Sequence, residues 1–300
     1  MSNRRKIIIK NKKRDKILFY VNNYEAPEKA DYQHVIISLA EGLKDLDIVF
    51  DSNINYYKLS NEEYLFTSIP RHILTNSNKK YKTIMLDWSD GLMEHFENKS
   101  LYDYYFTTNY NKNIMNMFNN VFPLAFYSTN RIIKATSKHI EYSKKKDKVF
   151  YPHRIDHYFR ELNKKLYIEE DFIRIFNDNF RQPLENTEEY LWWSQTGRRH
   201  NTQFYSELSN SKIVDCSGGY FTGKIAYQID SFKLWEGFFS KCCVICLDFD
   251  YFNIKLPVQP INMVHYIGLT NDINENRKII KSLKSRDLDP EKIAKEGYKW

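Results

Sequence analysis

Residues 211–249 read SKIVDCSGGYFTGKIAYQIDSFKLWEGFFSKCCVICLDF, and the fold class follows from this stretch. It divides into a strand that ends at Cys216, a glycine loop, a helix and a second strand. The helix begins at Asp230 or Ser231, since both residue types are favoured at an N-cap. The second strand, residues 242–248, is apolar on both faces, which is typical of a strand buried inside a parallel sheet. The stretch therefore predicts one unit of an α/β sheet.

Strands and helices alternate on both sides of this unit as well. Val35, Leu39 and Leu43 recur at helical spacing, so a helix is expected between the first two strands. Such alternation indicates an α/β protein with right-handed crossovers, and the lysine cluster near residue 145 indicates a division into domains 1–145 and 146–300. Strands are expected at residues 16–21, 47–50, 64–67, 83–87, 104–108, 122–127, 148–151, 211–216, 242–248 and 264–269, and helices at 31–46, 156–180, 187–209, 230–240 and within 271–300.

Composition and charge narrow the class of protein. Of the 300 residues, 42% are hydrophobic and 28% are charged, which is typical of a folded globular protein and not of a disordered or coiled-coil chain. No apolar run approaches the ~20 residues of a membrane span, and no leader peptide is expected. The net charge of +7 favours acidic partners. The basic residues before Asp15 are interpreted as a solvated tail or as a contact with an anionic membrane surface. We expect a cytoplasmic protein that does not bind nucleic acid, because no nucleic-acid motif is present.

The cysteines and glycines exclude several kinds of site. Cys242, Cys243 and Cys246 lie in the apolar strand and Cys216 ends the preceding one, so we interpret all four as small core residues. No second cysteine pair completes a zinc site, and a disulfide framework is not expected. The motifs G-x-G-x-x-G and G-x-x-x-x-G-K are missing from the sequence, which argues against an NAD-binding domain or a P-loop NTPase.

The glycine loop is the first candidate for a binding site. Gly218 and Gly219 follow the strand directly, where the backbone can approach a ligand closely. The N-terminus of the next helix, at Ser231, carries a partial positive charge, and Lys224 and Lys233 lie nearby in the sequence. A helix N-terminus with cations beside it is a suitable seat for a diphosphate.

The stretch also resembles the donor-sugar half of GT-B glycosyltransferases, most of all exostosin-like and bacterial polysaccharide-type enzymes. The residues Lys233-Leu234-Trp235-Glu236 and 241–245 stand where that superfamily typically has R-x-x-E-x-x-x-x-G-x-x-x-I. Segments 202–213, 86–91, 104–106, 122–126 and 293–300 follow the order seen in the bacterial enzymes. The usual glycine before the last strand is replaced by Lys241-Cys242, and the chain stops at Trp300, where relatives usually continue.

This resemblance implies two Rossmann-like domains facing each other across a cleft, with the acceptor on the side of residues 1–145 and the nucleotide sugar on that of 146–300. It implies transfer of a sugar from a nucleotide-diphosphate donor to a glycan or lipid-linked acceptor, with no metal and no further cofactor. Glu236 lies one position past Trp235, near the edge of the apolar face of the helix. It would accept hydrogen bonds from ribose or sugar hydroxyls. Cationic side chains would neutralise the leaving diphosphate, namely Lys233, Lys224, Arg198, Arg199 and Arg154.

Candidates for the catalytic base are carboxylates and histidines at turns and strand ends. They are Asp31 and His34 at a helix start, Asp87 and Asp90 after a strand, and His153 at the end of the second domain's first strand. Each also fits an ordinary turn or cap. The spacing Asp248-Phe249-Asp250 leaves a metal-dependent GT-A enzyme open. Two further alternatives are a GT10-type fucosyltransferase and a non-catalytic basic module that binds anionic polymers or a membrane surface.

Overall fold

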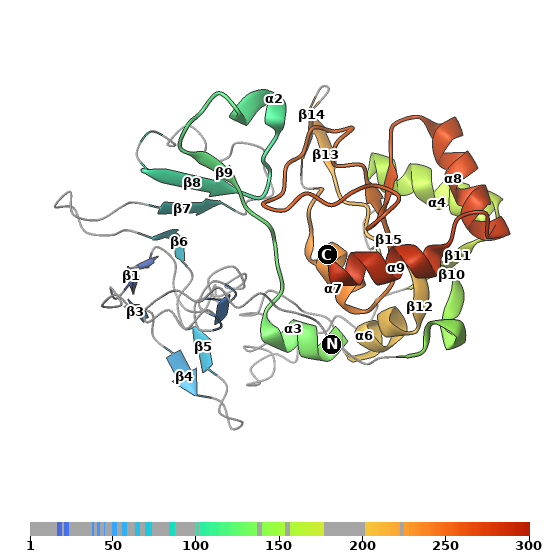
Figure 1. Ribbon diagram of the computed structural model, residues 1–300, viewed down its shortest axis with the longest axis horizontal. Coiled ribbons are helices and arrows are strands. Elements are labelled where there is room, and N and C mark those ends of the chain that lie inside the picture. The colour runs from blue at the N-terminus through green and yellow to red at the C-terminus, as the bar shows by residue number, and fades with distance from the viewer. Residues whose placement is uncertain are drawn as a thin grey trace.

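The computed structural model shows an α/β protein whose two larger sheets come from the two halves of the chain (Figure 1). The strands of the first half gather on one side of the picture and the sheet of the second half lies on the other. The structure describes residues 17–19, 21–23, 38, 41–42, 45, 50–52, 56–58, 64–66, 70–73, 84–87, 100, 102–136, 140–153, 157–176, 202–222, 225–227 and 229–300. No helix among these residues is long and apolar enough to cross a membrane.

The second half forms a parallel five-stranded sheet in the order β11-β10-β12-β15-β16. This topology confirms the expected α/β class and the strands predicted at 148–151, 211–216, 242–248 and 264–269. The strands are β10 (Lys146–Tyr151), β11 (Ile173–Ile175), β12 (Ser211–Asp215), β15 (Cys243–Leu247) and β16 (Ile267–Leu269), and the helices are α4 (Tyr158–Glu169), α6 (Thr202–Ser209), α7 (Phe232–Phe239), α8 (Ile273–Ser285) and α9 (Pro290–Lys299).

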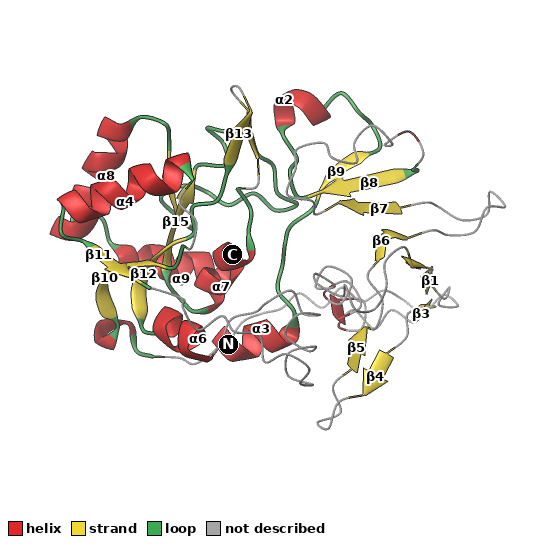
Figure 2. Cartoon of the chain, turned by 180° about the vertical axis from the view of Figure 1, so that it is seen from behind, coloured by secondary structure: helices red, strands yellow, loops and turns green. Residues whose placement is uncertain are grey.

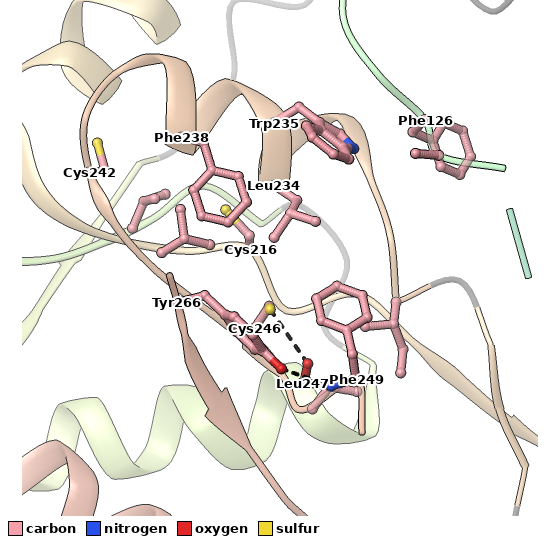
Figure 3. Close-up of a cluster of buried hydrophobic side chains, with 14 of the residues drawn as sticks. Phe126, Cys216, Leu234, Trp235, Phe238, Cys242, Cys246, Leu247, Phe249 and Tyr266 are labelled. Carbon is pink, nitrogen blue, oxygen red and sulfur yellow. Dashed lines mark hydrogen bonds between the residues drawn. The ribbon is translucent and has the colours of Figure 1, made fainter. Parts of the chain in front are cut away.

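The cysteine-rich strand β15 is buried on both faces, as its sequence predicts. Successive side chains of a strand point to opposite faces. Cys243 and Ile245 therefore join one core cluster, together with residues of α8 and α9. Val244 and Cys246 join the other, with residues of α6 and α7. Figure 2 shows α4 and α8 beside each other, and Figure 3 shows side chains of α7 above two of the buried thiols.

The first half contains a mixed five-stranded sheet in the order β2-β6-β7-β8-β9. Strands β7, β8 and β9 are parallel, whereas β6 runs antiparallel to both of its neighbours. Two short pairs, β1 with β3 and β4 with β5, lie outside this sheet. The bounds are β1 (Ile17–Phe19), β2 (Val21–Asn23), β3 (Phe50–Ser52), β4 (Tyr56–Lys58), β5 (Tyr64–Phe66), β6 (Pro70–Ile73), β7 (Ile84–Asp87), β8 (Tyr104–Thr107) and β9 (Val121–Pro123), with α2 at Lys112–Met115.

Several of the expected elements differ in the structure. The strand expected over residues 122–127 ends at Pro123. The helix expected over residues 156–180 ends at Glu169, and β11 follows it. Asp171 reverses the chain with a positive φ of 46°, which places the buried Phe172 against the sheet. Between the glycine loop and the helix, where no strand is expected, the strands β13 (Tyr220–Thr222) and β14 (Ile225–Tyr227) form an antiparallel hairpin.

Residues 124–129 carry the chain from β9 to α3 (Asn130–Thr136), and Figure 1 shows this crossing between the two halves. Helix α3 precedes the predicted boundary between residues 145 and 146, yet it packs on α6 and α7. Ala125, Phe126 and Ile132 belong to the same core cluster as those helices. In its packing, the chain thus enters the second half's core at residue 125. A 3-10 turn at Tyr142–Lys144 then leads into β10.

The halves also meet through the loop that follows β15. The backbone N–H of Lys112 donates to the carbonyl of Asn253 at 2.7 Å, and Lys255 N–H donates to the carbonyl of Tyr110 at 3.0 Å. The Lys112 ammonium pairs with the Asp250 carboxylate at 2.7 Å. These contacts fasten the end of β8 and α2 to the second half.

Candidate functional site

The candidate site lies at the carboxyl ends of β10 and β12, which are neighbours in the parallel sheet. Ligands of open α/β sheets bind at this edge, because the loops there diverge from adjacent strands. His153 stands two residues after β10, and Asp215 is the last residue of β12. The sheet register therefore brings together two side chains that are 62 positions apart in the sequence.

Asp215 is a buried carboxylate surrounded by donors. Its Oδ1 lies 2.8 Å from His153 Nε2 and accepts the Ser217 backbone N–H at 2.8 Å. Its Oδ2 accepts the hydroxyl of Tyr167, which comes from α4. Burial alone raises the pKa of Asp215, but the hydrogen bonds from His153, Tyr167 and Ser217 outweigh it, so the net shift is downward. Asp215 is therefore ionised at neutral pH.

His153 is neutral in this setting. Neither its side chain nor that of Asp215 has any exposed surface. Burial, and after it the Lys233 charge, lower the pKa of His153 to about 3 against the opposing effect of Asp215. The ring of Tyr151 packs against its edge, with the ring centroids 4.7 Å apart. His153, predicted as a catalytic base, is thus an enclosed imidazole in contact with Asp215.

Lys233 reaches the same cluster from the first turn of α7. Its Nζ donates to the carbonyl of Pro152 at 2.9 Å and lies 3.4 Å from His153 Nδ1. Ser231 is the N-cap residue of α7, which confirms the predicted helix start, although its side chain makes no capping hydrogen bond. The structure thus brings together two of the predicted residues, His153 and Lys233.

The glycine loop borders this cluster. Ser217, Gly218 and Gly219 are buried, and Gly219 has a φ of +107°, where a Cβ would lie 2.8 Å from Leu247 Cδ1. Only glycine adopts this conformation without strain. The loop is held from α4, since Arg160 Nε donates to the Ser217 carbonyl at 2.8 Å and Asn163 Nδ2 donates to Ser217 Oγ at 3.0 Å.

Several members of this cluster were not found by the sequence analysis. The sequence predicts Asp215 only as part of a strand, and Tyr167, Arg160 and Asn163 only as part of a mixed-charge helix. Arg160 had one usable signal, because it stands in the first turn of the helix that follows His153. The contacts of Asp215 and Tyr167 depend on sheet register and on helix packing, for which the sequence holds no local signal.

Glu236 is placed differently from expectation. It was expected near the edge of the apolar face of α7, but it has no exposed surface. Its Oε1 accepts the hydroxyl of Tyr205 in α6 at 3.2 Å. The expectation of an edge position was wrong because α6 covers that side of α7. Its role in binding donor hydroxyls remains a prediction.

The other predicted residues lie outside the described part of the chain. Asp87, weighed beside Asp90, is described and is a buried carboxylate at the end of β7 that accepts the Tyr105 hydroxyl. The remaining candidates lie outside the described residues; they are Asp31, His34, Asp90, Arg154, Arg198, Arg199 and Lys224.

Asp248 and Asp250, whose spacing is typical of a metal-binding motif, make contacts that hold the loop after β15. Asp248 Oδ1 accepts the backbone N–H groups of Asp250 and Tyr251, and its Oδ2 accepts Asn262 Nδ2 at 2.6 Å. Asp250 pairs with Lys112 of the first half. Among the residues that the structure describes, no group of three histidine, cysteine or acidic side chains is arranged to hold a metal ion.

Another buried carboxylate, Asp230, connects the crossing segment to α7. Asp230 Oδ2 accepts the Phe126 backbone N–H at 2.7 Å, and its Oδ1 accepts Trp235 Nε1 at 2.8 Å. The Tyr127 ring stacks on Trp235 with centroids 4.8 Å apart, and Figure 3 shows Phe126 on the same side of α7 as Trp235. Burial raises the pKa of Asp230 to about 7 against the effect of these donors.

No protein-family model matches this sequence, and no curated protein matches it. Among solved structures, an alpha-glucosyltransferase in complex with UDP-glucose and DNA is similar at a TM-score of 0.42 and 10% identity, over 72% of this chain and 66% of that one. TarM is similar at a TM-score of 0.40 and 10% identity, over 81% of this chain and 64% of that one. A UDP-N-acetylglucosamine 2-epimerase from Listeria monocytogenes is similar at a TM-score of 0.36 and 11% identity, over 94% of this chain and 92% of that one. The matched part thus spans just under two thirds of the glucosyltransferase and of TarM.

Proposed function

We propose that this protein is a glycosyltransferase that moves a sugar from a nucleotide-diphosphate donor to a glycan or lipid-linked acceptor. The diphosphate of the donor would lie at the carboxyl edge of the second sheet. The observation that carries this proposal is the position of the Lys233 ammonium, which extends from the first turn of α7 to the Pro152 carbonyl and the His153 ring just after β10. The sequence resemblance to donor-sugar halves supports the same assignment.

Two neutral groups orient the Lys233 ammonium. The Pro152 carbonyl and the neutral His153 ring orient the ammonium without neutralising it. Arg160 places a second cation near His153, and its charge acts on that ring. The α7 N-terminus adds its partial positive charge. A fixed set of positive groups of this kind stabilises the negative charge that develops on a departing diphosphate.

The finer assignments are part of this proposal. Glu236 would bind the ribose or sugar hydroxyls, the first half would bind the acceptor, and the cations would act without a metal. The protein would work in the cytoplasm, with its basic N-terminal segment touching an anionic membrane surface. Arg154 follows His153 directly and would join the cations.

A thermal-shift panel of UDP, GDP, ADP and CDP tests the central claim. A ligand that binds only the folded state raises its stability in proportion to the logarithm of ligand concentration over Kd. We expect one of the four diphosphates to raise the Tm of the protein clearly more than the others do. A sugar nucleotide with the same base should then be hydrolysed, or its sugar transferred. If no nucleoside diphosphate changes Tm while polyanions do so in a strongly salt-dependent way, the protein is a basic binding module and the proposal fails.

A further inference from the structure

We propose that His153 is a positioning residue, a neutral bridge whose Nε2–H donates to Asp215 and whose bare Nδ1 accepts from the Lys233 ammonium. The bridge holds Lys233 in the cationic site and links its charge to a carboxylate that has no exposed surface. The last step, that this positioning serves a diphosphate, rests on the proposed function. The tautomer and the bridge themselves do not.

The position of the proton follows from the acceptors. An ionised carboxylate can only accept hydrogen bonds, and Asp215 already accepts from the Ser217 N–H and the Tyr167 hydroxyl. The 2.8 Å contact with His153 Nε2 therefore requires the proton on that nitrogen. In a neutral ring Nδ1 is then an acceptor, and Lys233 Nζ lies 3.4 Å from it. An ammonium has only donors, so both contacts agree on one tautomer.

The groups around the ring leave Asp215 and Lys233 as the charged ends of the bridge. Burial raises the pKa of Tyr167 well above its usual range, so its hydroxyl keeps the proton and donates. Burial likewise keeps the Cys216 thiol protonated, and it donates to the Lys233 carbonyl at 3.0 Å. Arg160 adds a second positive charge near the imidazole. Opposite charges on the two sides polarise the ring and strengthen both of its hydrogen bonds.

The bridge explains why a buried carboxylate stands at the bottom of a site proposed for an anion. An uncompensated buried charge is costly, and Asp215 would repel a diphosphate if it faced one directly. Here the neutral imidazole separates it from Lys233, which presents the cation. His153 is thus enclosed behind Lys233, and the reaction would need another group as its base.

The first test measures the tautomer without any nucleotide. Long-range proton–nitrogen NMR spectra of the 15N-labelled full chain resolve the ring nitrogens, and the His153 signals are assigned by their loss in His153→Leu. We expect a neutral ring with protonated Nε2 from pH 5 to pH 8. In Lys233→Met the imidazole should protonate at a higher pH than in the wild type, because a nearby positive charge is removed. A ring that is protonated on Nδ1, or charged at pH 6, would overturn the bridge.

The second test measures what the bridge does for Lys233. His153→Leu removes both ring contacts, whereas His153→Asn keeps a short-chain acceptor where Nδ1 now lies. With the four nucleoside diphosphates as probes, we expect at least tenfold weaker binding in His153→Leu and a recovery of most of that loss in His153→Asn. Equal binding by the wild type and both variants would overturn the positioning role. If the wild type binds none of the four, the proposed function fails, and the NMR result alone decides the bridge.

Discussion

Lys145 and Lys233 lie at opposite ends of α7, and each donates its ammonium protons to backbone carbonyls. Lys145 donates to the carbonyls of Ser240 and Lys241 at 2.6 and 3.1 Å, just past the helix C-terminus. Lys233 donates to the carbonyl of Pro152 at 2.9 Å, near the helix N-terminus. The two lysines therefore form a matched pair, one capping a helix and the other placed in the candidate site.

We predict that the two lysines have different roles, Lys145 in stability and Lys233 in nucleotide binding. Lys145→Met leaves buried carbonyls at the α7 C-terminus without their donor, so the free energy of unfolding should fall by about 1–3 kcal/mol. Lys233→Met should weaken nucleoside-diphosphate binding at least tenfold. Urea unfolding and calorimetric titration measure the two effects. Equal loss of affinity in both variants would mean that Lys233 acts only through stability.

The buried Asp230 predicts a stability that depends on pH. Its folded pKa of about 7 lies above the ordinary value of 3.8, so the folded state binds the extra proton between these values. Stability from this group is complete below about pH 4 and is lost as the pH rises through 7, by up to about 1.4 kcal/mol per pH unit. Urea unfolding of the wild type and Asp230→Asn from pH 4 to 8 measures it. The difference in their unfolding free energies should change across this window, and a constant difference would refute the assignment. The exposed variant Asp287→Asn serves as the control.

Gly219 and Gly42 offer a second matched pair. Gly219→Ala places a Cβ 2.8 Å from Leu247 at a φ of +107°, so unfolding free energy should fall by about 1–3 kcal/mol. Gly42 has helical backbone and no atom within 4 Å of an added Cβ, so Gly42→Ala should be neutral or stabilising by up to about 1 kcal/mol. Thermal and urea unfolding compare the two. A Gly219→Ala protein of wild-type stability would show that the loop accommodates a side chain.

Glu236 and its partner Tyr205 separate a binding role from a packing role. Glu236→Gln keeps the shape of the side chain but replaces the carboxylate that would accept hydrogen bonds from the hydroxyls of the donor. We therefore expect at least tenfold weaker binding of the donor nucleotide. Tyr205→Phe removes only the hydroxyl that donates to Glu236 at 3.2 Å. It should cost about 1 kcal/mol of stability and leave binding unchanged. If both variants change stability alone, Glu236 is a core residue.

The strands and helices that the sequence predicts well are those with strong local patterns. Strand β15 carries apolar residues on both faces, and α7 begins directly after a favourable N-cap residue. Strand β11 was missed because it has only three residues and follows a helix with the same mixed charge. Glu236 was misplaced because periodicity shows which face of a helix is apolar but not whether another helix, here α6, covers the adjacent side.

By itself the sequence determined the α/β architecture of the second half, the core role of the four cysteines and the start of α7 at Asp230 or Ser231. These depend on hydrophobic periodicity and capping, which act between residues close in the chain. Only the tertiary structure decided that Asp215, His153 and Lys233 meet. His153 is 62 positions from Asp215 and 80 from Lys233, so their contacts arise from sheet register and helix packing. Their burial together then sets which groups are charged, since desolvation and neighbouring charges act only once the chain has folded.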